Sequence, residues 1–281
     1  MKIAITGATG QLGQIVVTKL KERTNADNLV ALVRTPEKAK NLGIEVRNFD
    51  YTKIEDQEQA LKGIDTLLLI SSSEVGQRAT QHKNVIDSAK KAGVKRIAYT
   101  SILCADASKM ALAPEHLITE NALKESGIDY TILRNGWYTE NYAANIPGAL
   151  QAGAVIGCAG DGKISSATRE DFAEAAVAVL TTEGHNNKIY ELAGDEAYTL
   201  DDFASEISKQ TGKNIPYNNL SETEYTSALV EVGVPEYFAK VLADSDAKAA
   251  EGALYSDDKT LSKLIGHSTT PLKEIVKRFL K

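Results

Sequence analysis

The chain begins with a short apolar run that leads directly into three glycines. Residues 2–6 read Lys-Ile-Ala-Ile-Thr, and Gly7, Gly10 and Gly13 follow with two residues between neighbours. Apolar residues then recur at helical spacing over residues 11–23. Glycines at a strand-to-helix junction allow a tight turn, close approach of the backbone to a pyrophosphate, and close packing of the helix on the strand. The pattern favours a dinucleotide site; the alternative for three such glycines is a purely structural turn.

Strand and helix patterns alternate after this turn, which implies parallel strands joined by right-handed crossovers. We expect an α/β fold, a Rossmann-type doubly wound parallel sheet, over residues 1–134, with returning segments from about 167–190. Residues 135–281 are expected to form a smaller α/β domain that covers the substrate. The predicted strands are 2–6, 29–33, 45–49, 66–70, 96–100, 130–133 and 188–192; the predicted helices are 11–23, 36–42, 54–61, 78–92, 114–126, 171–180, 199–210, 222–231, 236–244 and 271–280.

Charge and composition exclude several kinds of partner. The 281 residues carry 32 Lys and Arg against 38 Asp and Glu, a formal charge of −6, without a dense basic run, so we expect no nucleic-acid partner. Apolar stretches fall short of the roughly 18 residues that span a bilayer, and the N-terminus reads as a core strand, so we expect a cytoplasmic protein without a membrane partner. The four dispersed histidines match no metal motif. Monomer and homodimer are both compatible with this composition.

Arg34 follows the second predicted strand, about 21 residues after Gly13. A dinucleotide site of this kind ordinarily has an acid there, which holds the ribose hydroxyls. A guanidinium instead pairs with a 2′-phosphate, so Arg34 favours NADPH (NADP+) over NADH. The alternative is a solvated surface arginine.

Polar residues also follow the next three strands. Ligands in open parallel sheets bind beyond the carboxyl ends of the strands, so these residues are candidates by position. Asp50, with Tyr51 beside it, is placed to reach the adenine edge. Residues 71–73 (Ser71, Ser72 and Ser73) and Ser101 are placed near the inner phosphate and the nicotinamide ribose. Polar residues after strands are also ordinary turn formers, which is the alternative for each of them.

The motif Thr6-Gly-Ala-Thr-Gly-x-Leu-Gly13, Arg34, the strand 96–100 with Ser101, and the segment Leu133-Arg-Asn-Gly-Trp-Tyr138 together resemble the atypical, NmrA-like branch of the short-chain dehydrogenases/reductases. Over essentially its full length the chain is also similar to bacterial NAD(P)H:quinone oxidoreductases. This resemblance implies two-electron hydride transfer from NADPH to a small-molecule quinone, with neither flavin nor metal. It implies that the cofactor is bound by Thr6, Gly7, Ala8, Thr9, Gly10, Gln11 and Leu12, with the pyrophosphate held by Gly7, Thr9, Gly10, Gln11 and Leu12.

One departure from the larger superfamily affects the chemistry. Its members carry Tyr-x-x-x-Lys on the helix after Ser101, whereas this chain has His116-x-x-x-Glu120 in the comparable region. A lysine there lowers the tyrosine pKa, and a glutamate would do the opposite. His116 and Glu120 are i, i+4 neighbours that could pair with each other, in a structural role or in a cofactor or proton-donor role. Hydride transfer to a quinone makes a weakly basic phenolate, so positioning can suffice without that pair.

The loop after the sixth predicted strand carries Asn135, Gly136, Trp137 and Tyr138. In the family this loop borders the nicotinamide and the substrate, and an aromatic pair beside an amide suits a flat ring with two carbonyls. The alternative is that the two rings close the seam between the domains. Tyr138, His116 and Asn135 are the candidates for positioning the substrate or donating a proton.

Two other functions remain open from the sequence. NmrA-like proteins that lack the Tyr/Lys pair can bind NADP(H) and regulate a protein partner without turnover. An epimerase or lyase with tightly held NAD is the third reading, but such enzymes generally use the missing acid-base pair.

Overall fold

The computed structural model describes residues 1–281, which form two compact units. Unit 1 comprises Met1–Ala105, Pro114–Asn135 and Arg169–Glu191. Unit 2 comprises Asp106–Ala113, Gly136–Thr168 and Leu192–Lys281. The segment 106–113, which the sequence division assigns to the first domain, therefore clusters with unit 2.

Unit 1 is built on a seven-stranded sheet in the order β3-β2-β1-β4-β5-β6-β8. Strands β1 to β6 pair in parallel, with Ile3 opposite both Leu29 on β2 and Thr66 on β4. This order reverses between β1 and β4, the place where ligands bind in open α/β sheets. The strands are β1 (Ile3–Thr6), β2 (Leu29–Val33), β3 (Glu45–Asn48), β4 (Thr66–Leu69), β5 (Arg96–Ile102), β6 (Asp129–Asn135) and β8 (Lys188–Leu192).

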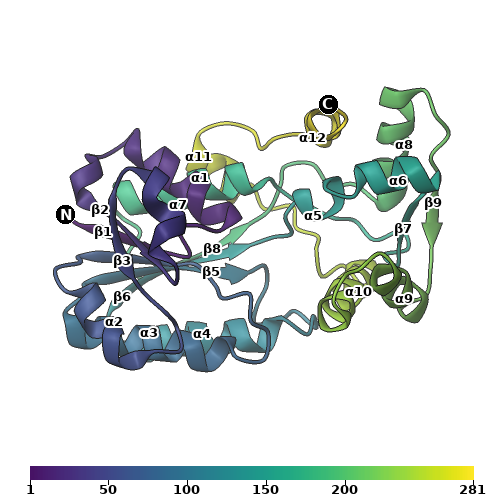
Figure 1. Ribbon diagram of the computed structural model, residues 1–281. Coiled ribbons are helices and arrows are strands. Elements are labelled where there is room, and N and C mark those ends of the chain that lie inside the picture. The colour runs from purple at the N-terminus through teal and green to yellow at the C-terminus, as the bar shows by residue number, and fades with distance from the viewer. The chain divides into compact units, whose positions relative to one another are not determined.

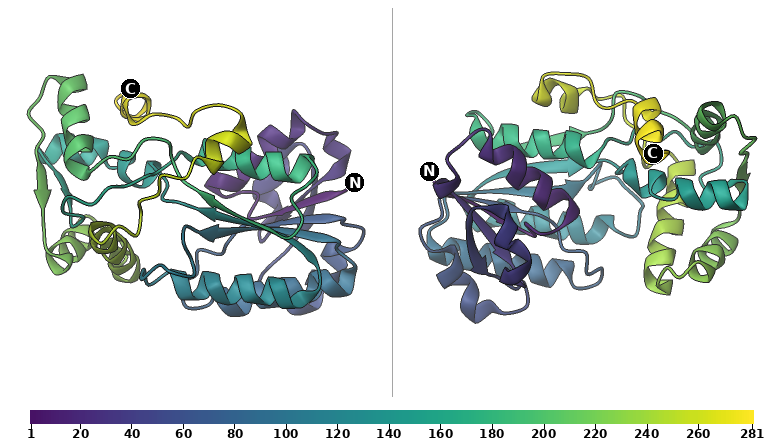
Figure 2. Two further views of the ribbon diagram at one scale, coloured as in Figure 1. Left: turned by 180° about the vertical axis from the view of Figure 1, so that it is seen from behind. Right: turned by 45° about the horizontal axis from the view of Figure 1, so that its top comes forward.

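Helices cover both faces of this sheet. Figures 1 and 2 show α2, α3 and α4 on one face and α1 and α7 on the other. Because both faces are covered, every residue of β1, β2 and β4 is buried, and all but Thr6 and Thr66 are apolar. The helices of unit 1 are α1 (Gln11–Lys21), α2 (Ile54–Leu61), α3 (Arg78–Ala92), α4 (Ala113–Ser126) and α7 (Arg169–Thr181), with 3₁₀-helices η1 (Ala26–Asn28) and η2 (Pro36–Leu42).

Unit 2 contains mainly helices. Its two-stranded parallel sheet pairs β7 (Val155–Gly157) with β9 (Tyr217–Asn219). Helices α8 and α9 each begin with a capping box, in which Thr199 and Ser221 accept from the third backbone N–H of their helix. The helices are α5 (Glu140–Ala143), α6 (Ile146–Ala152), α8 (Leu200–Thr211), α9 (Glu222–Glu231), α10 (Glu236–Ala250), α11 (Thr260–Ile265) and α12 (Leu272–Phe279).

The predicted Rossmann-type α/β fold is confirmed. The short elements η1, α5, α6, β7, β9 and α11 lie outside the predicted strands and helices, and two predicted helices also differ in detail. The segment 36–42 is a 3₁₀-helix, since Pro36 starts a short turn that ends at a left-handed Gly43 (φ +68°). Helix α10 continues six residues past the predicted end at 244, to Ala250, because its buried face continues through Asp246 and Ala249.

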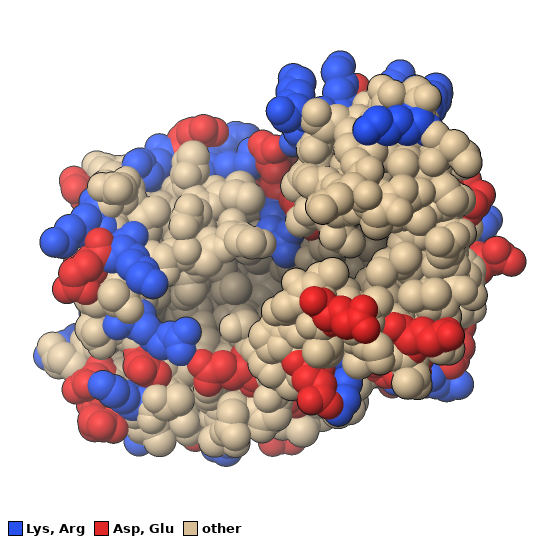
Figure 3. Space-filling model, turned by 45° about the vertical axis from the view of Figure 1, so that its right-hand side comes forward, with Lys and Arg blue, Asp and Glu red and all other residues tan.

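The surface mixes charges of both signs. Lys and Arg side chains lie beside Asp and Glu side chains along the left-hand edge of the face shown in Figure 3, and the middle of that face carries mostly other residues. None of the helices is both long and apolar enough to cross a bilayer.

Candidate cofactor-binding site

The glycine turn joins β1 to α1 in unit 1. Gly7 adopts a left-handed backbone (φ +58°), and its carbonyl accepts from the Gly10 N–H at 2.8 Å. A Cβ at Gly13 would lie 2.2 Å from the Gly7 oxygen and 2.8 Å from the Ala8 Cα, so only glycine fits there. The close approach of helix to turn aims the first N–H groups of α1 at the end of β1, which is the geometry of an anion site.

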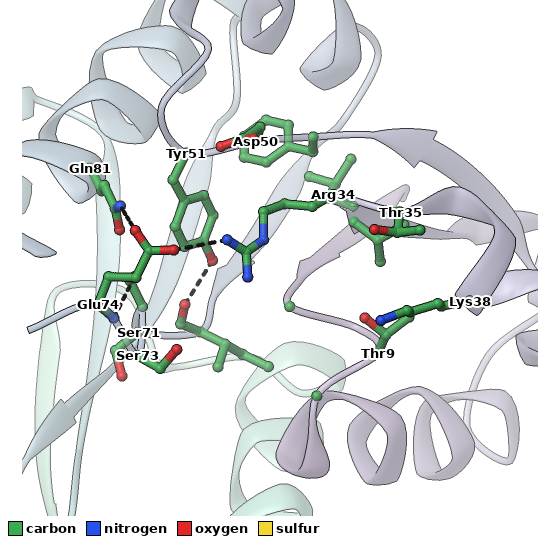
Figure 4. Close-up of a pocket in the computed structure, with 17 residues that line it drawn as sticks. Thr9, Arg34, Thr35, Lys38, Asp50, Tyr51, Ser71, Ser73, Glu74 and Gln81 are labelled. Atoms are coloured by element: carbon green, nitrogen blue, oxygen red, sulfur yellow. Dashed lines mark hydrogen bonds and ion pairs between the residues drawn. The ribbon is translucent and has the colours of Figure 1, made fainter. Parts of the chain in front are cut away.

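A cavity of roughly 360 Å³ lies beside this turn, at the carboxyl ends of the strands. Gly7, Thr9 and Gly10 line it from the turn, and Arg34 reaches into it from the end of β2 (Figure 4). The strand ends and loops supply the rest of the lining: Leu32, Val33, Thr35, Lys38, Phe49, Asp50, Tyr51, Ile70, Ser71, Ser72, Ser73, Glu74 and Gln81.

The loop after β4 is fixed by hydrogen bonds from outside the cavity. The Ser71 N–H donates to Thr100 Oγ1 at 2.9 Å, and the Ser72 N–H donates to His82 Nε2 at 2.9 Å. The Ser72 carbonyl accepts from Arg78 Nε at 2.8 Å. These bonds use backbone groups that a loop would otherwise leave unsatisfied, so the serine side chains are held at the cavity wall by a rigid support.

His82 behind this loop is a neutral acceptor. Burial, together with the charge of Arg78, lowers the pKa of His82 to about 3. Because Nε2 accepts from the Ser72 N–H, Nδ1 carries the proton and donates to Thr119 Oγ1 at 3.0 Å. His82 therefore supports the cavity wall and does not supply a charge to it.

The comparisons with known proteins match this geometry. The NAD(P)H-binding family model matches residues 7–183, the part of the chain that includes the turn and the cavity. The chain is 57% identical over 277 residues to quinone oxidoreductase 2 of Escherichia coli (strain K12), covering 98% of this chain and 97% of that protein. The chain belongs to the NAD(P)H-binding family. Its expected likeness to NmrA-like oxidoreductases is confirmed as well.

Two solved structures of the family carry the comparison further. An NADPH-dependent quinone oxidoreductase from Escherichia coli, complexed with NADPH, superposes with a TM-score of 0.97 at 56% identity, covering 99% of this chain and 100% of that chain. The triphenylmethane reductase of Citrobacter sp., complexed with NADP(H), has a TM-score of 0.95 at 40% identity, covering 99% of this chain and 100% of that chain.

Only some of the site residues that the sequence predicts line this cavity. Gly7, Thr9, Gly10, Arg34, Asp50 and the three serines 71–73 line it. Thr6 does not, because its buried hydroxyl donates to the Leu68 carbonyl and accepts from the Ile70 N–H. The other predicted residues that do not line the cavity are Ala8, Gln11, Leu12, Ser101, His116, Asn135, Gly136, Trp137 and Tyr138.

Sequence reasoning missed several lining residues. Lys38 lies four residues after Arg34, so a second cation near the first was a usable signal. Glu74 and Gln81 come from the loop after β4 and from α3, and nothing in their spacing points to the cavity. Only the fold brings them beside Arg34.

His116 and Glu120 do not pair with each other, although they are one helical turn apart. The His116 Nδ1 lies 2.7 Å from the Tyr99 hydroxyl. Glu120 instead holds Arg134, and the Ser101 hydroxyl donates to Glu120 Oε1 at 2.7 Å. Burial, with the nearby charge of Arg78, lowers the pKa of His116 well below its ordinary value. A neutral imidazole in this environment is a poor proton donor, and the geometry fits a structural role.

Asn135, at the end of β6, is buried without a hydrogen-bond partner for either atom of its side-chain amide. The Trp137 indole N–H is also buried without a partner. Buried polar groups are nearly always paired, so an unsatisfied amide is typical of a position that a ligand or water completes.

Proposed function

We propose that this protein is an NADPH-dependent quinone oxidoreductase, which reduces a quinone by two electrons without a flavin. The observation that carries the proposal is the 57% identity to quinone oxidoreductase 2 over 98% of the chain. The likeness to a reductase of triphenylmethane dyes supports an acceptor that is conjugated and aromatic. Bound NADPH would supply the hydride.

The glycine turn is proposed to hold the pyrophosphate. Gly7 adopts the left-handed backbone of the turn, and the absence of a Cβ at Gly13 lets α1 approach the Gly7 carbonyl. The N-terminus of α1 adds N–H donors and the positive end of its dipole. Thr9 and Gly10 line the cavity beside it.

Arg34 and Lys38 are proposed to bind the 2′-phosphate. Both line the cavity, and the Arg34 side chain is 66% exposed, so its guanidinium is accessible to a ligand. No carboxylate takes the place after β2 that would hold a free ribose hydroxyl. The fork of an arginine matches a phosphate in two parallel hydrogen bonds, whereas a lysine adds a point charge.

Proton supply is proposed to be secondary to positioning. Glu120 is committed to a buried ion pair with Arg134, and His116 is neutral, so neither matches the Tyr/Lys chemistry of related dehydrogenases. Reduction of a quinone yields a phenolate that water can protonate. Asn135 is proposed to offer its unpaired amide to a carbonyl of the nicotinamide or the quinone, with Trp137 and Tyr138 supplying aromatic surface.

The proposed roles of these residues also assign a role to each part of the chain. We propose that residues 1–134 with the returning segment near 167–190 bind the cofactor, and that residues 135–281 cover the substrate. We further propose a cytoplasmic enzyme acting as a monomer or homodimer on a small-molecule quinone, with neither nucleic acid nor membrane as partner.

Steady-state oxidation of NADPH with 1,4-benzoquinone tests the proposal. Turnover that depends on both enzyme and quinone, in protein without flavin absorbance, is the expected result. Tight NADPH binding without turnover would instead identify a non-catalytic NADP(H)-binding regulator of the NmrA type. Flavin absorbance in the purified protein would contradict direct hydride transfer.

A further inference from the structure

We propose that Glu74 sets the cofactor preference of the site by competing with the 2′-phosphate for Arg34. The inference rests on the proposed function, because it assumes that Arg34 binds the phosphate of NADPH. Arg34 favours NADPH, and Glu74 acts against it. The ratio of NADPH affinity to NADH affinity is therefore lower than Arg34 alone would give.

Arg34 and Glu74 approach the cavity from different elements. Arg34 leaves the end of β2, and Glu74 lies in the loop between β4 and α3. Arg34 Nη1 donates to Glu74 Oε1 at 2.8 Å, and Figure 4 shows the two side chains meeting at the cavity. Their side chains are 66% and 43% exposed, so solvent and ligands have access to this ion pair.

The Glu74 carboxylate is held toward Arg34 by its own neighbours. Gln81 Nε2 donates to Glu74 Oε2 at 2.7 Å, which leaves Oε1 for the guanidinium. The Glu74 N–H donates to Ser72 Oγ at 3.1 Å, within the loop that His82 and Arg78 support. The hydrogen bonds to Gln81 and Ser72 therefore orient the Glu74 carboxylate toward Arg34.

A 2′-phosphate carries up to two negative charges at neutral pH, and it needs the guanidinium that Glu74 occupies. Binding of NADPH must therefore displace the carboxylate from Arg34. NADH has a ribose hydroxyl at the same place, and a hydroxyl can donate to a carboxylate. Glu74 thus weakens NADPH binding and strengthens NADH binding through one group.

The experiment measures binding directly, by calorimetric titration of wild type and Glu74→Gln with NADPH, NADH, 2′,5′-ADP and 5′-AMP. Glutamine keeps the size and the acceptor for Gln81 while it removes the charge. We expect Glu74→Gln to bind NADPH and 2′,5′-ADP about threefold more tightly, and NADH about twofold less tightly, the scale of one exposed ion pair. Glu125→Gln, an exposed acid on α4, is the charge-matched control and should leave all four affinities unchanged.

A double-mutant cycle locates the effect on Arg34. In the Arg34→Ala background, Glu74→Gln should no longer tighten NADPH binding. Unchanged or weaker NADPH binding by Glu74→Gln, or an equal gain in the Arg34→Ala background, would overturn the inference. Quinone turnover by the wild type is measured separately, so a failure of the proposed function is distinguishable from a failure here.

Discussion

Arg134 on β6 places its guanidinium on the carboxylate of Glu120 on α4, with Nε–Oε1 at 2.9 Å and Nη2–Oε2 at 2.7 Å. The Glu120 side chain is fully buried and the Arg134 side chain is 5% exposed. The sequence resemblance places Glu120 in the region where short-chain dehydrogenases carry the lysine of their Tyr-x-x-x-Lys pair. The departure from that pair is therefore built into the core of unit 1, since Glu120 is the fully buried partner of Arg134, which also pairs with the partly exposed Glu191.

We predict that Glu120→Lys strongly destabilises the protein. The change replaces a buried partner of Arg134 with a like charge and should cost at least about 3 to 5 kcal/mol of unfolding free energy. Urea unfolding followed by circular dichroism measures it. Glu125→Lys, on the exposed side of the same helix, should change stability by less than about 0.5 kcal/mol. Equal stability of both variants would show that the ion pair is dispensable.

Much of the sheet could be predicted from sequence because local pattern determines it. Apolar runs such as 29–33 match β2 to the residue, and the glycines at 7 and 13 fix the turn by sterics that act within a few residues. The partners of Glu120 and Arg34 could not be predicted in this way. Arg34 and Glu74 lie 40 residues apart and meet through the strand order. Glu120 and Arg134 lie only 14 residues apart, but they meet through the packing of α4 on the sheet, which no local pattern specifies.

The same limit explains why His116 and Glu120 do not pair with each other, although their spacing allows it. An i, i+4 spacing permits a contact along a helix, but each side chain also faces the sheet, where stronger partners compete. The Tyr99 hydroxyl reaches His116 from β5, and Arg134 reaches Glu120 from β6. Helical spacing carries no information about those strands.

Arg34→Ala should raise the KM for NADPH far more than the KM for NADH. Loss of a charged hydrogen bond to the 2′-phosphate costs about 1.5 to 3 kcal/mol, roughly a tenfold to hundredfold change in KM. Initial rates with both cofactors and one quinone measure the split. Arg23→Ala removes an exposed arginine after α1 and should leave both values unchanged. A similar loss with NADH and NADPH would show that Arg34 does not bind the 2′-phosphate.

Gly13→Ala should damage cofactor binding together with the turn. Its methyl group would lie 2.2 Å from the Gly7 oxygen, so the turn and α1 must move apart. We expect NADPH affinity to fall at least about tenfold and stability to fall by about 1 to 3 kcal/mol. Gly93→Ala is the control, because it strains a left-handed backbone (φ +80°) with nothing within 4 Å. That variant should lose stability but keep its NADPH affinity, as measured by calorimetry; normal binding by Gly13→Ala would contradict the role of the turn.

His82 should make the protein sensitive to mild acid. Burial, with the charge of Arg78, lowers the His82 pKa from 6.5 to about 3, so the unfolded chain binds a proton below pH 6.5 that the folded chain refuses. The unfolding free energy should therefore fall as the pH drops from 6.5 toward 3, by about 2 kcal/mol at pH 5 for this one group. His116 acts in the same direction, since its pKa is also lowered by burial.

Urea unfolding at pH 7.5, 6 and 5 separates the contribution of His82 from that of other groups. His82→Gln keeps an acceptor for the Ser72 N–H but cannot take up the proton. Its stability should fall less steeply toward pH 5 than that of the wild type, whatever its stability at pH 7.5. If His82→Gln runs parallel to the wild type between pH 7.5 and 5, the acid sensitivity does not arise at His82.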